Sequence, residues 1–270
     1  MAKKSLLKST KNAKQNNSNK NNTKNKTKIQ ATLIIMTKNE ITGLNALFDK
    51  LPIKSFAEVI AIDAQSTDGS KEFLQNNGLK VVTQKKMGRA EAFRIGCALA
   101  HFENVIFFSP DGNEDYKDIE KLAYWLNQGY DIAVASRFMK GGRSDDYKEF
   151  FPLRAYGNRG FTLLANIIWR GNLTDSINGF RAIKRNKFWK LNLDSEGFGI
   201  EFQLSIRALK LRYKIKEIPS IEGDRIGGQS TAKTFQTGWY FVRLILQEFL
   251  IGKSFTQTSQ IRDKYRITHY

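Results

Sequence analysis

The sequence predicts an α/β fold built on a mostly parallel β-sheet with helices on both faces. Between Thr32 and Phe138, short runs rich in Val and Ile alternate with segments of helical spacing. The runs are almost continuously apolar, which is typical of strands buried on both faces. Alternation of this kind joins parallel strands through crossover helices. Polar side chains that follow the strands are therefore expected at one edge of the sheet, where ligands bind in such folds.

The first half of the chain is expected to contain five strands, with a helix after each of the first four. The predicted strands lie at 31–38, 57–64, 79–84, 104–110 and 131–138. The predicted helices lie at 40–51, 67–78, 88–102 and 116–129. Asp68, Gly69 and Ser70 form a turn and N-cap signal for the second helix, which Gly78 ends. A helix cap is accordingly the expected role of Asp68.

After residue 140 the pattern becomes less regular, and we find no internal repeat. The predicted order is a polar loop at 141–154, a helix at 155–171, mixed turn and strand at 175–189, a helix at 198–213, a strand at 214–221 and a basic, glycine-rich loop at 222–233. The segment 239–252 is expected to be an amphipathic helix, because Arg243, Gln247 and Glu248 interrupt its apolar run. This helix either packs on its own domain or contacts a membrane surface.

The composition indicates one large domain with a basic extension. The 270 residues are 41% hydrophobic and carry a net charge of +18, which leaves ample apolar material for a core. Residues 1–30 contain nine lysines and no acid, which is half of the net charge. Such a segment cannot bury enough apolar surface to offset the entropy of ordering it. We therefore expect a disordered tail at 1–28, a main domain at 29–235, and an amphipathic helix with a tail at 236–270.

The cysteine and histidine contents limit the compartment and the kind of metal site. Cys97 is the single cysteine, so no internal disulfide is expected, and a reducing, cytoplasmic compartment fits. His101 and His269 are too few for a histidine-based metal site. No apolar run approaches the roughly 20 residues that a membrane-spanning helix needs. We expect no signal peptide, because no apolar core follows the first lysines.

Acidic side chains follow two of the predicted strands. Asp63 leaves the second strand, where a carboxylate can accept a hydrogen bond from the N–H of a uracil or guanine ring. Asp111 follows the fourth strand, with Glu114 and Asp115 close behind. Carboxylates held on a tight turn suit a hard cation such as Mg²⁺ or Mn²⁺. On local sequence alone, a solvated acidic turn that caps the helix near Tyr116 explains Asp111 equally well.

Basic side chains in the loops favour the metal interpretation. Five arginines lie in or beside loops: Arg137, Arg143, Arg154, Arg181 and Arg225. A guanidinium group pairs well with phosphate oxygens, and one such contact at ~4 Å near a protein surface has roughly 4 kcal/mol of Coulomb attraction before desolvation. Each arginine alone is explained by a solvated surface charge. Together with the acidic corner, they predict a phosphate-rich ligand.

From about residue 31 to 235 the chain resembles glycosyltransferase family 2, the inverting enzymes with the GT-A fold, and most of all their dolichyl- or polyprenyl-phosphate sugar synthases. The resemblance rests on segments that follow one another in the family's order. They are "IIMTKNE" (34–40), "IDAQSTDGS" (62–70), "SPDGNEDYKDI" (109–119), "SRFMKGG" (136–142), "DSINGFRAIKR" (175–185), "IEFQLSIRALKLRYKIKEIP" (200–219) and "DRIGGQSTAK" (224–233). The resemblance implies a Rossmann-like GT-A glycosyltransferase domain at 29–235.

The resemblance also implies roles for the residues at matching positions. Those implied to bind the nucleotide sugar are Thr37, Glu40 and Asp63 at the base or ribose, and Arg225, Ser230 and Lys233 over the diphosphate. Asp111 would hold Mg²⁺ or Mn²⁺ as the remaining acid of the DxD motif. Its implied helpers are Asn113, Glu114 or Asp115. Arg137 and Arg181 would face the acceptor or its phosphate.

The chain departs from the family pattern at three positions. Ser109 occupies the first acidic position of the metal motif. Ala64 and Gln65 replace an aspartate and a glycine of the family's "DDGS" segment. The synthases often have transmembrane helices after the catalytic domain, and no such run occurs here. Metal binding is therefore expected to depend on Asp111 and its neighbours.

The implied reaction moves a sugar from a nucleoside diphosphate sugar to an acceptor, with inversion at the anomeric carbon. A metal and arginines would stabilise the negative charge on the departing diphosphate. A saccharide hydroxyl acceptor needs a general base, for which Asp175 and Glu201 are the candidates. Asp175 is explained equally well as a residue that caps a turn, and Glu201 as a residue that begins a helix. A lipid phosphate needs no base because it is largely ionised near neutrality. An arginine set without an obvious base favours a polyprenyl or dolichyl phosphate, and a saccharide hydroxyl is the alternative.

Two other functions fit parts of the sequence. A sugar-phosphate nucleotidyltransferase shares the sheet and the metal–diphosphate chemistry, but it needs a glycine-rich basic loop where this chain has "TKNEITG" (37–43). A nucleic-acid-binding module fits the charge. The tail holds half of that charge, however, and no recognised motif occurs, so we expect no nucleic acid partner. The tail either holds the enzyme on an anionic membrane, at its cytoplasmic face, or only keeps the chain soluble.

Overall fold

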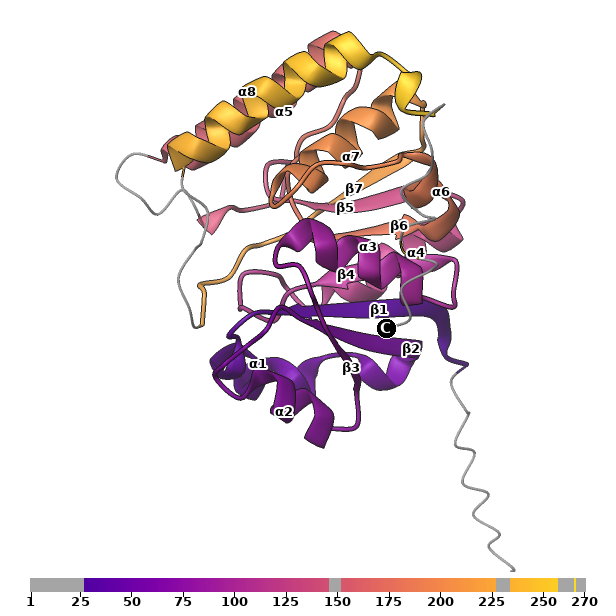
Figure 1. Ribbon diagram of the computed structural model, residues 1–270, viewed down its shortest axis with the longest axis vertical. Coiled ribbons are helices and arrows are strands. Elements are labelled where there is room, and N and C mark those ends of the chain that lie inside the picture. Colours follow the sequence, from indigo (N-terminus) through magenta and orange to yellow (C-terminus); the bar gives the residue numbers. More distant parts are fainter. Residues whose placement is uncertain (1–26, 146–151, 227–233, 257–264, 266–270) are drawn as a thin grey trace, which may run out of the picture.

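The computed structural model describes residues 27–145, 152–226, 234–256 and 265. The strands are β1 (Ile29–Thr37), β2 (Phe56–Asp63), β3 (Lys80–Thr83), β4 (Asn104–Phe108), β5 (Ile132–Ser136), β6 (Arg181–Lys184) and β7 (Ile215–Pro219). The helices are α1 (Ile41–Leu47), α2 (Ser70–Asn76), α3 (Arg89–Leu99), α4 (Asp118–Asn127), α5 (Leu153–Trp169), α6 (Arg185–Lys190), α7 (Gly199–Lys210) and α8 (Thr234–Ile251). Figure 1 shows these elements in a single layered unit.

The strands form one seven-stranded sheet in the order β3-β2-β1-β4-β6-β5-β7. Strands β1 to β4 run parallel, and so do β5 and β7. Strand β6 runs antiparallel to its neighbours β4 and β5. The predicted mostly parallel α/β sheet is confirmed, whereas the direction of β6 was not predicted. As a consequence, the residues before β6 lie at the same edge as the residues after β4.

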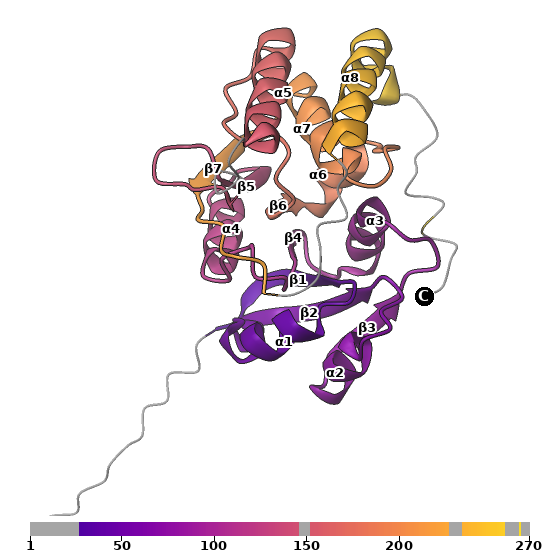
Figure 2. The same cartoon turned by 90° about the vertical axis from the view of Figure 1, so that its left-hand side faces the viewer.

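Alternating side chains along β1 divide the core into two layers. Leu33 and Ile35 pack on the face covered by α1, α2 and α4. Ile34 and Met36 pack on the opposite face, which α3, α6 and α7 cover. Figure 2 shows α3 and α4 on opposite sides of the sheet. Both faces of the central strands are therefore buried, which is the physical reason for their continuous apolar runs.

Helices α5 and α8 lie side by side outside α7, farthest from β1 (Figures 1 and 2). Ala165 of α5, Phe202 of α7 and Phe241 of α8 belong to a third buried cluster. The prediction that 239–252 packs on its own domain is thus confirmed for one face of α8. On another face, Trp239 is 61% exposed. In the described ranges, none of the helices combines the length and the apolar character needed to span a bilayer.

Candidate active site

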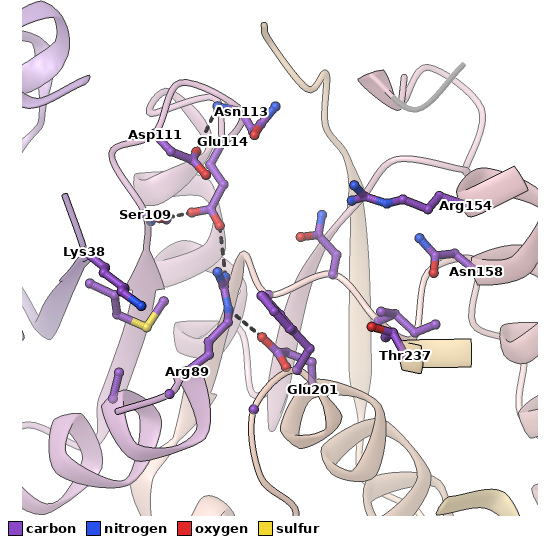
Figure 3. A pocket seen from close by; sticks show the side chains of 18 of the residues that line it. Lys38, Arg89, Ser109, Asp111, Asn113, Glu114, Arg154, Asn158, Glu201 and Thr237 are labelled. Carbon is purple, nitrogen blue, oxygen red and sulfur yellow. Dashed lines mark hydrogen bonds and ion pairs between the residues drawn. The ribbon is translucent and has the colours of Figure 1, made fainter. Parts of the chain in front are cut away.

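The site lies at the carboxyl edge of the sheet, where strand ends from both halves of the chain meet. Thr37 at the end of β1 is in register with Asp63 at the end of β2. Phe107 of β4 pairs with Arg181, the first residue of antiparallel β6. The segment 175–180 therefore enters the sheet where β4 leaves it. These loops surround a cavity of about 1020 Å³ (Figure 3).

Asp111 and Arg225 meet inside this cavity. The Arg225 Nη2 atom lies 2.8 Å from Asp111 Oδ2, and the Nη1 atom lies 3.9 Å from Glu40 Oε1. The prediction that the acidic corner and the distant basic loop converge is confirmed. Ser230 and Lys233, which we also expect over the diphosphate, lie outside the described residues.

Backbone contacts hold the Asp111 loop against the Arg225 loop. The N–H of Ile226 donates to the Asp111 carbonyl at 2.9 Å, and the N–H of Gly223 donates to the Asn113 carbonyl at 3.0 Å. Gly112 between them has a φ of +94°. A Cβ atom at this glycine would lie 2.8 Å from the carbonyl oxygen of the Asp224 residue. Both the backbone conformation and the close approach therefore require glycine at this position.

Arg89, the first residue of α3, joins two buried acids, and we did not predict it. Its Nη2 atom lies 3.3 Å from Glu114 Oε1, and its Nε atom lies 2.5 Å from Glu201 Oε1 (Figure 3). Gly179 makes room for this side chain, because a Cβ atom there would lie 2.0 Å from Arg89 Nη2. Arg89 opens α3, six residues after the end of β3. Lys85 and Lys86 lie closer to the end of β3, so the order of the sequence alone does not identify Arg89.

Glu114 is held by protein groups. Its Oε2 atom accepts a hydrogen bond from the Ser109 N–H at 2.7 Å, while Oε1 faces Arg89. Burial raises the pKa of Glu114 to about 8, against the opposing effect of Arg89. In this structure Glu114 positions Arg89 and the turn at Ser109. Its expected help in holding the metal remains a prediction.

Thr37 and Glu40 line the cavity. Thr37 Oγ1 and Glu40 Oε2 are buried and have no hydrogen-bond partner among the described residues. Burial raises the pKa of Glu40 to about 7, and the Asp111 carboxylate adds to the shift. Because an unpaired buried polar atom is costly, these two atoms are suited to a polar ligand. Their contact with a nucleotide remains a prediction.

Asp63 is fully buried, and the cavity wall does not include it. Its Oδ2 atom accepts a hydrogen bond from the Ser66 N–H at 3.1 Å. In this structure the carboxylate fixes the turn after β2. The expected contact of Asp63 with the base remains a prediction.

Arg137 and Asp175 form a buried pair. The Arg137 Nε atom donates to Asp175 Oδ2 at 2.7 Å, and Nη2 donates to Oδ1 at 3.0 Å. The side chain of Asp175 is 0% exposed and that of Arg137 is 7% exposed. A carboxylate held by both arms of a guanidinium is not placed to take a proton from an acceptor. The prediction of Asp175 as a general base is wrong. It positions Arg137, which does line the cavity.

Arg181 points into the protein interior. It is 0% exposed. It donates to the carbonyls of Asn178 at 2.8 Å and Glu201 at 3.1 Å. Burial lowers the pKa of Arg181 to about 10. The predicted contact of Arg181 with the acceptor is wrong, and the side chain supports the start of α7 instead.

Glu201, in the first turn of α7, lines the cavity and is 2% exposed. Its Oε2 atom has no hydrogen-bond partner within the described residues. Burial raises the pKa of Glu201, and the Arg89 and Arg181 guanidinium groups oppose the shift. A buried carboxylate with a raised pKa and one unpaired oxygen suits proton transfer. A role of Glu201 as general base therefore remains a prediction.

Helices α5 and α8 form the opposite wall of the cavity. Arg154 and Asn158, one turn apart on α5, and Thr237 of α8 lie across from Arg89 and Glu201 (Figure 3). The rest of this wall is apolar: Leu153, Phe161, Phe235, Trp239, Phe241 and Val242. The cavity therefore has a charged end at the sheet and an apolar end between the two helices. It suits a ligand pair that combines phosphates with an apolar group.

The donor set fits a divalent cation that is shared with a bound diphosphate. The described residues contain no group of three His, Cys, Asp or Glu side chains that could hold a metal alone. Asp111 and Asn113 do line the cavity with oxygen donors. The Arg225 guanidinium, 2.8 Å from Asp111, marks a point where positive charge is stabilised. Mg²⁺ is commonly held by one or two carboxylates, with phosphate oxygens and waters completing its shell.

Comparison with known proteins identifies relatives of this chain. Residues 32–191 match the sequence model described as Glycosyl transferase family 2. Glycosyltransferase AglJ of Haloferax volcanii is 29% identical over 203 residues, which are 74% of this chain and 65% of that protein. Dolichol-phosphate mannosyltransferase of Pyrococcus furiosus is 26% identical over 216 residues, which are 76% of this chain and 60% of that protein. The chain thus spans less than two thirds of the length of these two relatives.

A solved structure shares the fold. It is the crystal structure of glucosyl-3-phosphoglycerate synthase from Mycobacterium tuberculosis with Mn²⁺, uridine diphosphate and glucosyl-3-phosphoglycerate. The TM-score is 0.62 at 18% sequence identity, over 83% of this chain and 79% of that chain. This likeness, together with the sheet order, confirms the predicted GT-A fold.

Proposed function

Because the chain belongs to glycosyl transferase family 2, we propose that it transfers a hexose from a nucleoside diphosphate sugar to a lipid phosphate, with inversion at the anomeric carbon. The observation that carries this proposal is that one cavity has Asp111 and Arg225 at one end and the apolar wall of α5 and α8 at the other. The name of the relative from P. furiosus, a dolichol-phosphate mannosyltransferase, supports the lipid phosphate as acceptor.

The charged end of the cavity receives the donor. Thr37 and Glu40, whose buried oxygens lack partners among the described residues, bind the base or ribose. Arg225 leaves Asp111 and pairs with the diphosphate, since a guanidinium binds phosphate oxygens in the same way as it binds a carboxylate. Arg225 is suited to this movement because its side chain is 31% exposed.

A divalent cation, Mg²⁺ or Mn²⁺, is held by Asp111 and Asn113 together with the diphosphate. When bound, it offsets the negative charge that develops on the leaving diphosphate. Mn²⁺ in the solved M. tuberculosis relative supports this proposal. The residues of this chain keep the two ligands in place: Gly112 allows the turn, and Gly223 and Ile226 fix it through backbone hydrogen bonds.

The opposite wall receives the acceptor phosphate. Arg154 and Asn158 offer a guanidinium and an amide to the cavity from one face of α5, and Thr237 adds a hydroxyl from α8 (Figure 3). These groups take the place of Arg181, which is buried. The apolar side chains around Phe161 and Trp239 then contact the first units of the lipid chain. A phosphate acceptor is already ionised, so transfer to it needs no general base.

A saccharide hydroxyl is the second candidate acceptor, and one observation favours it. The Glu201 Oε2 atom faces the cavity without a partner among the described residues. Burial raises its pKa, which brings it closer to the range of a general base. Glu201→Gln separates the two acceptors, because only transfer to a hydroxyl needs this proton acceptor.

We also propose a cytoplasmic location with peripheral contact to an anionic membrane. A lipid acceptor brings its phosphate to the membrane surface, so the mouth of the cavity has to face that surface. The exposed apolar side chains of α8 near this mouth, Phe235 and Trp239, support this orientation.

The proposal is tested by a transfer assay with the purified full chain in detergent. Radiolabelled UDP- and GDP-hexoses are offered with Mn²⁺ and a short polyprenyl phosphate, or with a saccharide in its place. Arg154→Gln is expected to raise the KM for the lipid phosphate by roughly tenfold to a hundredfold, the value of one charge-assisted hydrogen bond. Arg159→Gln on the same helix is the matched control, because Arg159 is exposed and does not line the cavity.

Two outcomes contradict the proposal. One is an equal effect of the Arg154 and Arg159 variants on the KM for the lipid phosphate. The other is transfer to the saccharide alone, with loss of turnover in Glu201→Gln. The second outcome establishes the hydroxyl acceptor instead.

A further inference from the structure

Helices α5 and α8 each expose an apolar stripe that ends in a cation. Five exposed apolar residues on α8 follow a spacing of three and four residues, namely Phe235, Trp239, Val242, Leu246 and Phe249, and the exposed Leu250 lies beside the last of them. Lys253 follows two residues after the end of α8, beyond Gly252. The exposed members on α5 are Leu153, Tyr156, Leu163, Leu164 and Ile167, with Gly160 between the first two and the last three. Arg170 follows Ile167 by three residues. Two adjacent helices therefore present apolar stripes to the outside, and both stripes end in a basic residue.

A second cavity, of about 310 Å³, lies where these stripes end. We call it the distal basic pocket. Four of the residues that line it are basic, and none is acidic: Arg170, Lys210, Arg212 and Lys253. Trp169, the last residue of α5, also lines it. The catalytic cavity is lined by the first turns of α5 and α8, so the two cavities lie at opposite ends of the same helix pair.

Most of the positive charge of the distal basic pocket has no carboxylate partner. Lys210 is neutralised, because its Nζ atom lies 2.6 Å from Glu248 Oε2. Arg212 donates to the carbonyl of Arg170 at 3.2 Å. Within the part of the chain that the structure describes, Arg170, Arg212 and Lys253 form no ion pair with an acid. The pocket therefore attracts anions.

The C-terminal ends of α5, α7 and α8 provide another reason for cations here. Their unpaired carbonyls carry partial negative charge, which one basic residue in or just after the last turn offsets. This effect acts on each helix separately and requires no hollow between the helices. This effect does not explain why the basic residues of three helix ends line one pocket without an acid. It also does not explain why the pocket lies next to two exposed apolar stripes.

We propose that the distal basic pocket binds the phosphate group of an anionic lipid, and that the two stripes then lie on the bilayer. Guanidinium and ammonium groups pair with a lipid phosphate. Trp169 beside them suits the interface between headgroups and acyl chains. The inference rests on the proposed function, because a lipid acceptor requires the catalytic mouth to face the bilayer. Contacts at both ends of α5 and α8 hold these helices along the membrane plane.

Cosedimentation with vesicles tests this inference. Wild-type full-length chain is compared with Arg170→Gln/Lys253→Gln on phosphatidylcholine vesicles, with and without phosphatidylglycerol. The double variant is expected to partition roughly 30-fold less onto the anionic vesicles, because each basic residue close to such a surface contributes about fivefold. Binding to the neutral vesicles is expected to change far less.

The matched control is Lys50→Gln/Lys54→Gln, which removes the same charge from exposed positions outside α5 and α8. Equal losses in the two double variants overturn the proposal, because they indicate diffuse charge attraction. Wild-type binding by Arg170→Gln/Lys253→Gln overturns it as well.

Two further measurements distinguish other occupants. Inorganic phosphate at matched ionic strength is expected to leave vesicle binding unchanged, and full displacement assigns the pocket to free phosphate instead. Light scattering of the wild type is expected to show a monomer. If it shows a dimer that Leu246→Asp dissociates, and this variant still binds vesicles, the stripes contact a second copy of the chain and the proposal is overturned.

The detergent assay described above separates this inference from the proposed function. If the wild type transfers sugar in detergent while Arg170→Gln/Lys253→Gln binds vesicles like the wild type, the pocket proposal fails and the function stands. If the wild type transfers no sugar to a lipid phosphate while the double variant loses vesicle binding, the function fails and the pocket remains an anionic-lipid site.

Discussion

Asp175→Asn tests whether this carboxylate serves the fold or the chemistry. In the structure it receives two hydrogen bonds from Arg137, at 2.7 and 3.0 Å. Removing one partner of a buried ion pair costs about 3–5 kcal/mol, because the remaining charge stays buried and unpaired. We expect the lower end, about 3 kcal/mol, since Glu222 Oε1 lies 3.4 Å from Arg137 Nη1 and retains part of the attraction. The folded-to-unfolded ratio then falls by roughly 150-fold.

Urea unfolding followed by circular dichroism measures this loss. Thermal unfolding is expected to show a Tm lower by roughly 6–12 °C for a chain of this size. Asp49→Asn is the control, because Asp49 is exposed in a short 3-10 turn, and its effect is expected to stay within about 0.5 kcal/mol.

The opposite result refutes the structural role. If Asp175→Asn unfolds within about 1 kcal/mol of the wild type and yet loses its turnover with substrate affinity intact, Asp175 is the general base. The ion pair with Arg137 is then a feature of the resting enzyme only.

Two other changes have defined outcomes. Gly112→Ala is expected to weaken nucleoside diphosphate binding at least tenfold in calorimetry, because its Cβ atom meets the Asp224 carbonyl. Gly69→Ala is the control, because Gly69 has a similar positive φ but a Cβ atom there would meet nothing within 4 Å. Equal affinities of the two variants for the nucleoside diphosphate contradict this reasoning. Glu114 has a folded-state pKa of about 8 against an ordinary 4.5, so between these pH values the folded chain retains a proton that the unfolded chain has released. Stability is therefore expected to fall as pH rises through this window, and Glu114→Gln is expected to flatten that slope in urea unfolding; an unchanged slope contradicts the assignment.

The sheet was predictable because its strands are buried on both faces. Such strands are apolar without interruption, as in residues 105–108, and this pattern requires no knowledge of the rest of the chain. Strand β6 was harder to predict because it has only four residues (Arg181–Lys184). Its position between β4 and β5 depends on where the chain returns from α5, which local periodicity does not encode.

The convergence of Asp111 and Arg225 was predictable because it follows from the rule that parallel strands end at one edge. The roles of Asp175 and Arg181 were not predictable from residue type. An aspartate in a buried ion pair and an aspartate that acts as a base are the same residue in the sequence. The same is true of an arginine that binds backbone carbonyls and one that binds phosphate. Their partners, Arg137 and the backbone of the Glu201 turn, become visible only in three dimensions. Arg89 was not predictable either, because Lys85 and Lys86 precede it after β3 and only its contacts with Glu114 and Glu201 identify it.

The central claim is that Asp111 and Arg225 bind one diphosphate together. The most direct measurement is the thermal stabilisation of the chain by UDP, GDP, CDP and dTDP, each with and without Mn²⁺. We predict that one of them raises the Tm of the wild type in a metal-dependent manner, and that Asp111→Asn and Arg225→Gln each remove this increase. Full, metal-dependent stabilisation of both variants contradicts the claim.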